Sequence, residues 1–257
     1  MPTYAPDLDR ILSREPEPEG GIRTAEIDYD VAGTACRGFL AVPAQAPGPV
    51  PGVLVVHDWL GVTDVVRMRC EMLARLGYAA FAADVYGADT RPSDAEAAQV
   101  AGRFYGDQAL WRQRMTGAFE RMLEEDAVDA SRTAAIGYCF GGSSALQLAR
   151  TGADVKAVVS FHGGLQAGPE GEAERIRGSV LILTGAIDPV VPDDAVRAVQ
   201  DEFRRVPDLD WTVVTYAGAM HAFAVPTADA PDHGAQFHPR AEARSWTAMK
   251  DFFAEVL

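Results

Sequence analysis

The chain is poor in cysteine and in basic residues, and it lacks a long apolar run. Its 257 residues include three widely spaced cysteines, which fit a reducing cytoplasm better than a disulfide framework. No apolar run approaches the ~18 residues of a membrane span, and the acidic, proline-containing start lacks a signal-peptide pattern. Lys and Arg number 23 against 37 Asp and Glu, and this net charge of −14 disfavours nucleic acid or an anionic membrane as a partner. We therefore expect a cytoplasmic globular protein.

Apolar runs alternate with amphipathic segments from residue 22 onward. The sequence predicts strands at 22–31, 36–42, 53–57, 78–84, 134–138, 155–161, 179–185 and 211–216. It predicts helices from residue 64 to a stop at 77, and at 93–103, 108–125, 141–150, 193–206 and 240–256. This order is typical of βαβ units. We expect an α/β protein with a mainly parallel twisted sheet, helices on both faces and an antiparallel N-terminal hairpin. Residues 1–21 would form an N-terminal arm and residues 22–257 a single domain.

Polar and reactive residues follow several of the predicted strands. The carboxyl ends of parallel strands are where ligands gather in such a sheet. Cys139, Asp188 and His221 each follow a strand, and they occur in the chain order nucleophile, acid, base. That order, with a G-x-nucleophile-x-G turn at 137–141, is typical of the α/β-hydrolase arrangement.

The residue types at this turn suit nucleophilic catalysis. Glycines at 137 and 141 would avoid collisions in a strained turn. The helix that follows would favour a thiolate through its dipole and its amides. His221 could take the thiol proton, and Asp188 could orient that imidazole.

Simpler interpretations apply to the other candidates. Cys139, between its glycines, could also be a small buried residue. Cys36 falls in a predicted strand and Cys70 on a predicted helix, and we expect a packing role for both. His233 and His238 lie in a Pro/Gly loop, so we expect solvated side chains there and no metal site. His57 and His162 follow strands, and either could line a pocket or be a structural histidine.

Five segments, GYCFGG, VVHDWLGVTDVVR, ADVYG, TGAIDPVVP and MHAF, together resemble the dienelactone hydrolase family over nearly the whole chain from about residue 22. The resemblance implies a cofactor-free hydrolase of small-molecule esters or lactones that acts through an acyl-enzyme. It implies Cys139 as nucleophile, His221 as base and Asp188 as orienting acid. It also implies an oxyanion hole made by the backbone N–H groups of Trp59 and Phe140.

Two departures from the family pattern concern the substrate. A family glutamate that contacts the resting thiol is Asp58 here, one methylene shorter. Family members clamp a substrate carboxylate with two arginines. Val225 occupies one of those places, and Arg103 or Arg91 is the nearest candidate for the other. Valine supplies no charged donor, so we expect uncharged substrates. We expect the pocket wall to include His57, Phe161, His162, Phe223 and Val225.

Two other classes of function stay open at this point. One is a cysteine-elbow enzyme of the glutamine-amidotransferase or DJ-1 type. Amidotransferases usually carry their acid two residues after the histidine, where this chain has Phe223. The other is a catalytically inactive binding module on the same fold. The sequence predicts no oligomeric state.

Overall fold

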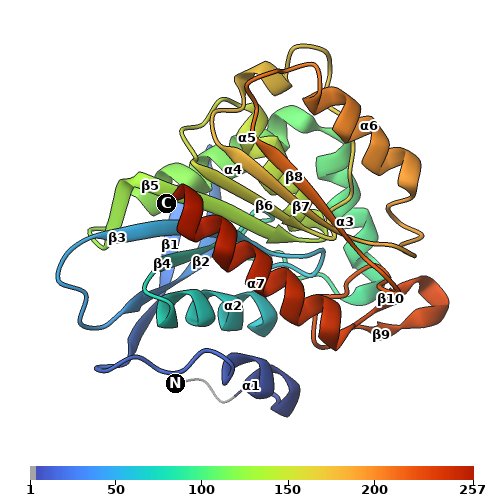
Figure 1. The fold of residues 1–257 in the computed structure, drawn as a ribbon. Helices are drawn as coiled ribbons and strands as arrows, with labels where there is room; N and C mark the ends of the chain where they lie inside the picture. The colour runs from blue at the N-terminus through green and yellow to red at the C-terminus, as the bar shows by residue number, and fades with distance from the viewer. Residues whose placement is uncertain (1–3) are drawn as a thin grey trace. The chain divides into compact units, whose positions relative to one another are not determined.

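The computed structural model describes residues 4–257. The chain divides into two compact units, residues 1–134 and 135–257. Figure 1 shows the first unit in blue to green and the second in green to red. The predicted division into an arm and a single domain that begins at residue 22 stays a prediction.

The first unit opens its sheet with the expected hairpin. Strands β1 (Ile22–Val31) and β2 (Thr34–Pro43) pair antiparallel, with Val31 opposite Thr34. The two turn residues, Ala32 and Gly33, both have positive φ, 52° and 80°. Two consecutive positive φ values define the tight turn whose twist matches that of the two strands. The predicted antiparallel N-terminal hairpin is confirmed.

Buried strands and covering helices complete the first unit. β3 (Val50–Val56) and β4 (Ala79–Ala83) are parallel, and β4 also pairs antiparallel with β2, which gives the order β1-β2-β4-β3. Helix α2 (Asp64–Arg75) packs on β2 and β4, and the chain leaves it through Gly77 at φ 98°. Helices α3 (Asp94–Gly106) and α4 (Gln108–Leu123) follow. The continuous apolar runs of β3 and β4 are buried, as expected for strands covered on both faces.

The N-terminal segment contains a helix that the sequence pattern did not predict. Helix α1 (Pro6–Leu12) buries Leu8, Ile11 and Leu12, and it packs against α2. The Tyr4 hydroxyl donates to Glu71 Oε1 of α2 at 2.7 Å. Because α1 covers this part of α2, Glu71 is buried together with the apolar side chains of α2.

The second unit carries four strands in the order β5-β6-β7-β8. β5 (Val128–Tyr138) begins in the first unit and ends in the second, and it is followed by β6 (Ala157–Phe161), β7 (Ser179–Gly185) and β8 (Trp211–Tyr216). The β6–β7 and β7–β8 pairs are parallel. The helices are α5 (Phe140–Arg150), α6 (Asp193–Phe203) and α7 (Pro239–Val256). Short elements lie between them: 3₁₀ turns at Ala173–Arg175 and Pro231–His233, and a two-residue ribbon, β9 (Asp229–Ala230) with β10 (Ala235–Gln236).

A buried ion pair ties α5 to α6. The Arg150 guanidinium donates to both carboxylate oxygens of Glu202, at 2.9 and 2.7 Å, and also to the Gln166 carbonyl at 3.1 Å. The Gly168 N–H donates to the same carboxylate at 2.9 Å. Two buried charges need this many partners because each has lost its water. The loop after β6 is therefore fixed to the helices behind it.

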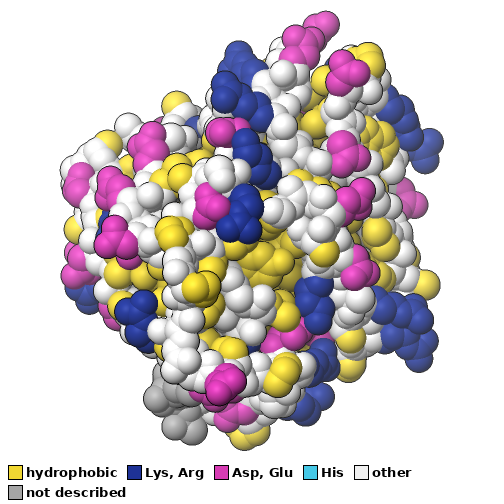
Figure 2. Space-filling model, turned by 60° about the vertical axis from the view of Figure 1, so that its left-hand side comes forward, with side chains coloured by type: hydrophobic (Ala, Val, Ile, Leu, Met, Phe, Trp, Pro, Cys, Tyr) yellow, Lys and Arg dark blue, Asp and Glu magenta, His cyan; other side chains and the backbone are white. Residues whose placement is uncertain are grey.

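Surface charges of both signs are interspersed across the face shown in Figure 2. In the described part of the chain, every helix is too short or too polar to span a bilayer.

Candidate active site

Cys139 lies in a strained turn between β5 and α5. Its φ of 55° and ψ of −115° are unusual for a residue with a side chain. A Cβ on Gly137 would overlap the Gly141 backbone, and one on Gly142 would lie 2.6 Å from Ser160 Oγ. The turn therefore requires these glycines. We call residues 137–142 the elbow.

Backbone hydrogen bonds hold the elbow against β6. The Cys139 N–H is shared between the Phe161 carbonyl at 3.0 Å and His162 Nδ1 at 3.2 Å. The Cys139 carbonyl accepts from the N–H groups of Gly142 and Ser143 in the first turn of α5. Phe140 is the first residue of α5, where backbone N–H groups point out of the helix end.

The structure brings Cys139, His221 and Asp188 into one hydrogen-bonded chain. His221 Nε2 lies 3.0 Å from Cys139 Sγ, and its Nδ1 lies 2.9 Å from Asp188 Oδ2. Asp188 Oδ1 accepts the N–H groups of Val190 and Val191 at 2.8 and 3.1 Å. With one oxygen held by the backbone, the other is free to orient the imidazole with Nδ1–H toward Asp188 and Nε2 toward the sulfur.

The loop that carries His221 is pinned on both sides. The His221 N–H donates to the Gly234 carbonyl at 3.0 Å, and its carbonyl accepts from the Gln236 N–H at 2.9 Å. The next residue, Ala222, has a φ of 56°. Pro189 of the acid loop packs so close to Gly234 that a Cβ there would collide with it. The loops that carry Asp188 and His221 are thus in contact.

The protonation of His221 depends on its neighbours. Burial on its own would lower the pKa of His221, but the charge of a Cys139 thiolate and the hydrogen bond and charge of Asp188 raise this pKa to about 10. At neutral pH the ring beside a thiolate therefore keeps its proton. The geometry can hold a thiolate–imidazolium pair.

Four of the expected pocket residues are buried in the second unit. Phe161, His162 and Phe223 are almost completely buried, and Val225 is nearly so. The His162 ring lies edge-to-face against His221, 5.3 Å between centroids, and against Phe223 at 5.0 Å. Of the four, His162 contacts His221 directly, and all four contribute little open surface.

Two exposed apolar side chains beside Asp188 were not predicted. Ile187 is 53% exposed and Val190 56% exposed, and both lie in the loop after β7. The TGAIDPVVP segment contained this signal, since an apolar residue precedes the acid and another follows its proline.

In the first unit, His57 has a structural environment. It is fully buried, its Nδ1–H donates to the Asp58 carbonyl at 2.6 Å, and its Nε2 accepts the Val85 N–H at 3.2 Å. Burial lowers the pKa of His57 to about 4, so the ring is neutral at physiological pH. It packs against Tyr86 at 4.5 Å between centroids. Of the two sequence-based interpretations, the local contacts favour the structural histidine.

Asp58 and Trp59 follow β3 in the same unit. Burial raises the pKa of Asp58 to about 6, although the Leu60 N–H that Oδ1 accepts at 2.8 Å lowers it. Trp59 is 40% exposed. Their expected roles toward Cys139, as thiol-contacting carboxylate and as oxyanion donor, stay predictions.

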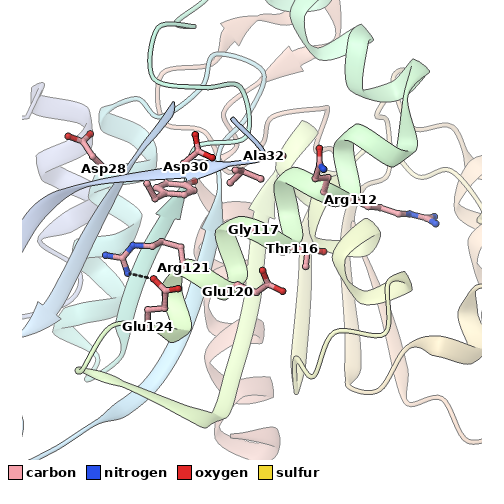
Figure 3. Close-up of a pocket in the computed structure, with 12 residues that line it drawn as sticks. Asp28, Asp30, Ala32, Arg112, Thr116, Gly117, Glu120, Arg121 and Glu124 are labelled. Carbon is pink, nitrogen blue, oxygen red and sulfur yellow. Dashed lines mark ion pairs between the residues drawn. The ribbon is translucent and has the colours of Figure 1, made fainter. Parts of the chain in front are cut away.

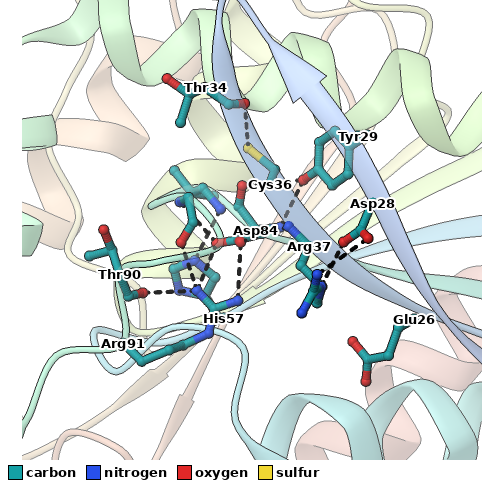
Figure 4. A network of polar contacts seen from close by, with 12 residues as sticks. Glu26, Asp28, Tyr29, Thr34, Cys36, Arg37, His57, Asp84, Thr90 and Arg91 are labelled. Carbon is teal, nitrogen blue, oxygen red and sulfur yellow. Dashed lines mark hydrogen bonds and ion pairs between the residues drawn. The ribbon is translucent and has the colours of Figure 1, made fainter.

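Arg91 is engaged in a polar network centred on Asp84 (Figure 4). Its guanidinium donates to both oxygens of the buried Asp84 carboxylate, at 3.3 and 3.1 Å, and to the Gly87 and Thr90 carbonyls, each at 2.8 Å. Because this positive charge is already neutralised, Arg91 is a poor clamp for a substrate carboxylate. Arg103 is exposed on α3.

The histidines of the 224–239 loop have no arrangement typical of a metal site. His238 is the N-cap of α7, and its Nδ1 accepts the Ala241 N–H at 3.2 Å. His233 is exposed. Among residues 4–257, no group of three or more His, Cys, Asp or Glu side chains could hold a metal ion.

Two surface hollows are lined by other residues. One of about 670 Å³ runs between the end of β1 and α4 in the first unit (Figure 3). Its charges pair locally, for example Arg121 with Glu124 at 3.7 Å. The other, of about 500 Å³, lies at α6, β7 and β8. Neither is lined by Cys139, Asp188 or His221.

Comparison with known proteins identifies the family. The model of the dienelactone hydrolase family matches residues 36–257. The chain belongs to this family. A Yersinia pestis protein provisionally named carboxymethylenebutenolidase is 25% identical over 91% of this chain and 89% of its own length. A Bradyrhizobium protein named "Probable 2-oxo-3-(5-oxofuran-2-ylidene)propanoate lactonase" is 27% identical over 86% of this chain and 89% of its own length.

A solved structure with higher identity is a dienelactone hydrolase-like promiscuous phosphotriesterase from metagenomic libraries. It is 42% identical, with a TM-score of 0.88 over 91% of this chain and 98% of that one. These matches confirm the α/β-hydrolase fold, and the family membership makes this chain an ester or lactone hydrolase.

Proposed function

We propose that the protein hydrolyses small esters or lactones with Cys139 as nucleophile, through a covalent acyl-enzyme. The observation that carries the proposal is the hydrogen-bonded chain from Cys139 through His221 to Asp188. The matched relatives support the reaction class, because one is named as a carboxymethylenebutenolidase and another as a lactonase.

Acylation begins with attack of the Cys139 thiolate on the ester carbonyl carbon. The carbonyl π electrons move to oxygen, and the resulting oxyanion faces the N–H of Phe140 at the start of α5, with Trp59 as the expected second donor. When the tetrahedral intermediate collapses, the C–O bond breaks. The leaving alkoxide takes the proton held on His221 Nε2.

Deacylation reverses these roles with water. His221, now neutral, removes a proton from water, and the hydroxide attacks the thioester carbon. Collapse releases the acid product and returns the thiolate beside a protonated His221. Asp188 keeps the same hydrogen bond to Nδ1 throughout, so that the imidazole does not have to reorient between the two halves.

The preferred substrates should be uncharged. Val225 offers no positive charge, and Arg91 is neutralised by Asp84. The exposed side chains on either side of Asp188, Ile187 and Val190, are apolar. A substrate carboxylate would therefore lose its water without gaining a charge-assisted hydrogen bond from these positions.

The expected preference for uncharged substrates also favours phosphotriesters as a second substrate class. They are uncharged, they react through a nucleophile at a tetrahedral centre, and the 42% identical solved structure is named for activity on them. The amidotransferase alternative is less favoured. The acid that contacts His221 comes from the loop after β7, while the second residue after the histidine, Phe223, is buried in the aromatic cluster.

The test is a substrate panel on wild type, Cys139→Ala and Cys36→Ala. The panel contains a neutral aryl ester, an unsubstituted lactone, a carboxylated lactone, a phosphotriester, glutamine and methylglyoxal. We expect wild type and Cys36→Ala to hydrolyse the neutral ester and lactone, and Cys139→Ala to be inactive. Turnover of only glutamine or methylglyoxal would refute the proposal, as would full ester hydrolysis by Cys139→Ala.

A further inference from the structure

His162 lies in a strained position directly after β6. Its φ of 39° is in the left-handed region, which few residues with a side chain adopt, although asparagine, aspartate and histidine do so more often than the others. The His162 N–H donates to the Leu183 carbonyl of β7 at 2.8 Å, which anchors this backbone to the sheet. Strain of this kind persists only where surrounding contacts hold it, and it concentrates at functional sites.

The first contact of the His162 side chain is with the nucleophile's own backbone. Nδ1 accepts the Cys139 N–H at 3.2 Å. An accepting ring nitrogen carries a lone pair and no proton, so this bond requires the Nδ1 position of His162 to be unprotonated. The bond restrains the one residue of the elbow with a positive φ and a reactive side chain.

The second contact is with the base. The His162 ring stands edge-to-face against His221 and against Phe223. A buried ring wedged on two sides limits rotation of the His221 imidazole about its side-chain bonds. Asp188 holds the Nδ1 end of the His221 imidazole, and the ring of His162 restrains the tilt of that imidazole. Together they keep Nε2 of His221 within hydrogen-bond distance of Cys139 Sγ.

We propose that His162 is a positioning residue that fixes Cys139 through its Nδ1 and His221 through its ring. This inference rests on the proposed function, because it concerns the same nucleophile and base. This double role explains why a histidine occurs at position 162. Asparagine tolerates the positive φ and supplies an acceptor but has no ring, whereas phenylalanine supplies a ring but no acceptor.

Two substitutions of His162 each remove one of the two contacts and keep the other. His162→Asn keeps an acceptor near the Cys139 N–H and removes the ring. His162→Phe keeps the ring and removes the acceptor. Since a misplacement of about 1 Å can cost about 100-fold in rate, we expect each variant to lower kcat by about 10- to 100-fold and to leave KM within about twofold.

His238→Phe is the matched control. His238 Nδ1 also accepts a backbone N–H at 3.2 Å, but it does so as the N-cap of α7. We expect the control to lower thermal stability and to leave kcat unchanged. Thermal unfolding of all variants separates loss of fold from loss of positioning.

A spectroscopic readout makes the test independent of turnover. The imidazole ¹⁵N shifts of His221 are titrated in each variant, and the rate of Cys139 alkylation by iodoacetamide is measured across the same pH range. A looser contact between Nε2 and Sγ should move the His221 titration to lower pH in both His162 variants and not in His238→Phe. An unchanged titration, or kcat within about twofold of wild type in both His162 variants, would overturn the inference.

The outcomes for the two proposals differ. If wild type hydrolyses no ester but the His221 titration moves as expected, the proposed function fails and the positioning role stands. If wild type is an active cysteine esterase and both His162 variants match it, only the positioning role fails.

Discussion

At the scale of single residues, three groups contact or constrain different atoms of Cys139, the proposed nucleophile. The elbow fixes its backbone with a positive φ, α5 begins at the residue after it, and His221 contacts its sulfur at 3.0 Å. The sequence pattern predicted that Cys139, Asp188 and His221 would meet, because each follows a strand of a parallel sheet, and their side chains are within hydrogen-bond distance; their catalytic roles stay predictions. It could not predict the positive φ of His162 or Ala222, because neither residue type requires that conformation.

Replacement of Asp188 tests the orienting acid. Asp188→Asn keeps an oxygen that can accept the N–H groups of Val190 and Val191, so the fold should persist. Loss of the charge should lower the pKa of His221 from about 10 and destabilise its reactive tautomer. The same change costs about 10⁴ in kcat in a serine protease, and we expect a loss of about 10³- to 10⁴-fold here. Steady-state kinetics beside Asp193→Asn, an exposed carboxylate at the start of α6, provides the check, and an equal loss in both variants would contradict the assignment.

Asp58 offers a test in which stability and activity can change in opposite directions. Its folded-state pKa of about 6 lies above its ordinary value of 3.8, because burial disfavours the charged form. The folded protein thus binds this proton more tightly than the unfolded chain, and Asp58 lowers stability as pH rises from about 4 to 6. Asp58→Asn should therefore be more stable than wild type at pH 7, by about 1–3 kcal/mol, and equal to it at pH 3.

Urea unfolding at both pH values measures this difference, and kcat/KM measured on the same samples tests the expected contact with the thiol. A variant that is more stable and less active would support a functional carboxylate. A variant less stable than wild type at pH 7 would contradict the stability argument.

At the scale of elements, the elbow is the part whose sequence and geometry are most tightly linked. A Cβ on Gly137 would overlap the Gly141 backbone, which has no flexible end that could move aside. Gly102, on α3, has open space around the position of a Cβ. Alanine at the two glycines should therefore have opposite effects.

Gly137→Ala should lose at least about 3 kcal/mol of stability or fail to fold, since overpacking against backbone is not relieved by a rotamer change. Gly102→Ala should gain about 0.5–1 kcal/mol, the difference between the two residues inside a helix. Urea midpoints of both variants give the result. A Gly137→Ala protein with a wild-type midpoint would show that the turn is looser than described.

The elements themselves were predicted to the extent that their side chains carry a pattern. The apolar run 179–185 matches β7 (Ser179–Gly185), and the run 211–216 matches β8. β5 begins at Val128, six residues before the predicted start at 134, because its first half is polar and exposed. Helix α1 was missed since its segment is acidic and proline-rich, and its burial depends on α2, which no local pattern reveals.

At the scale of the whole molecule, the net charge of −14 acts on any charged substrate before it reaches the site. At cellular salt the Debye length is about 8 Å, so this repulsion of anions is modest. The proposed preference for neutral over carboxylated substrates would therefore come mainly from local groups, of which Val225 is the one identified from the family pattern.

Val225→Arg tests this preference. A charge-assisted hydrogen bond is worth about 1.5–3 kcal/mol, or about 10- to 100-fold in specificity. We expect wild type to favour an uncharged lactone over its carboxylated analogue and the variant to shift the ratio of kcat/KM values toward the carboxylate by that factor. Ala198→Arg, which adds the same charge on the exposed side of α6, should not shift it. A wild type that already prefers the carboxylate tenfold or more would contradict the substrate proposal and direct attention to Arg103.

The central claim is that Cys139 carries the acyl group, and mass spectrometry of the quenched reaction tests it most directly. Wild type and Asp188→Asn are mixed with p-nitrophenyl acetate, quenched in acid within one turnover and digested. An acetyl group adds about 42 Da to the residue that holds it. The account predicts this mass on the peptide that contains Cys139, with a larger fraction in Asp188→Asn if deacylation is slowed, and none in Cys139→Ala. Acetyl found on another residue at the rate of turnover, or continued turnover by Cys139→Ala, would contradict it.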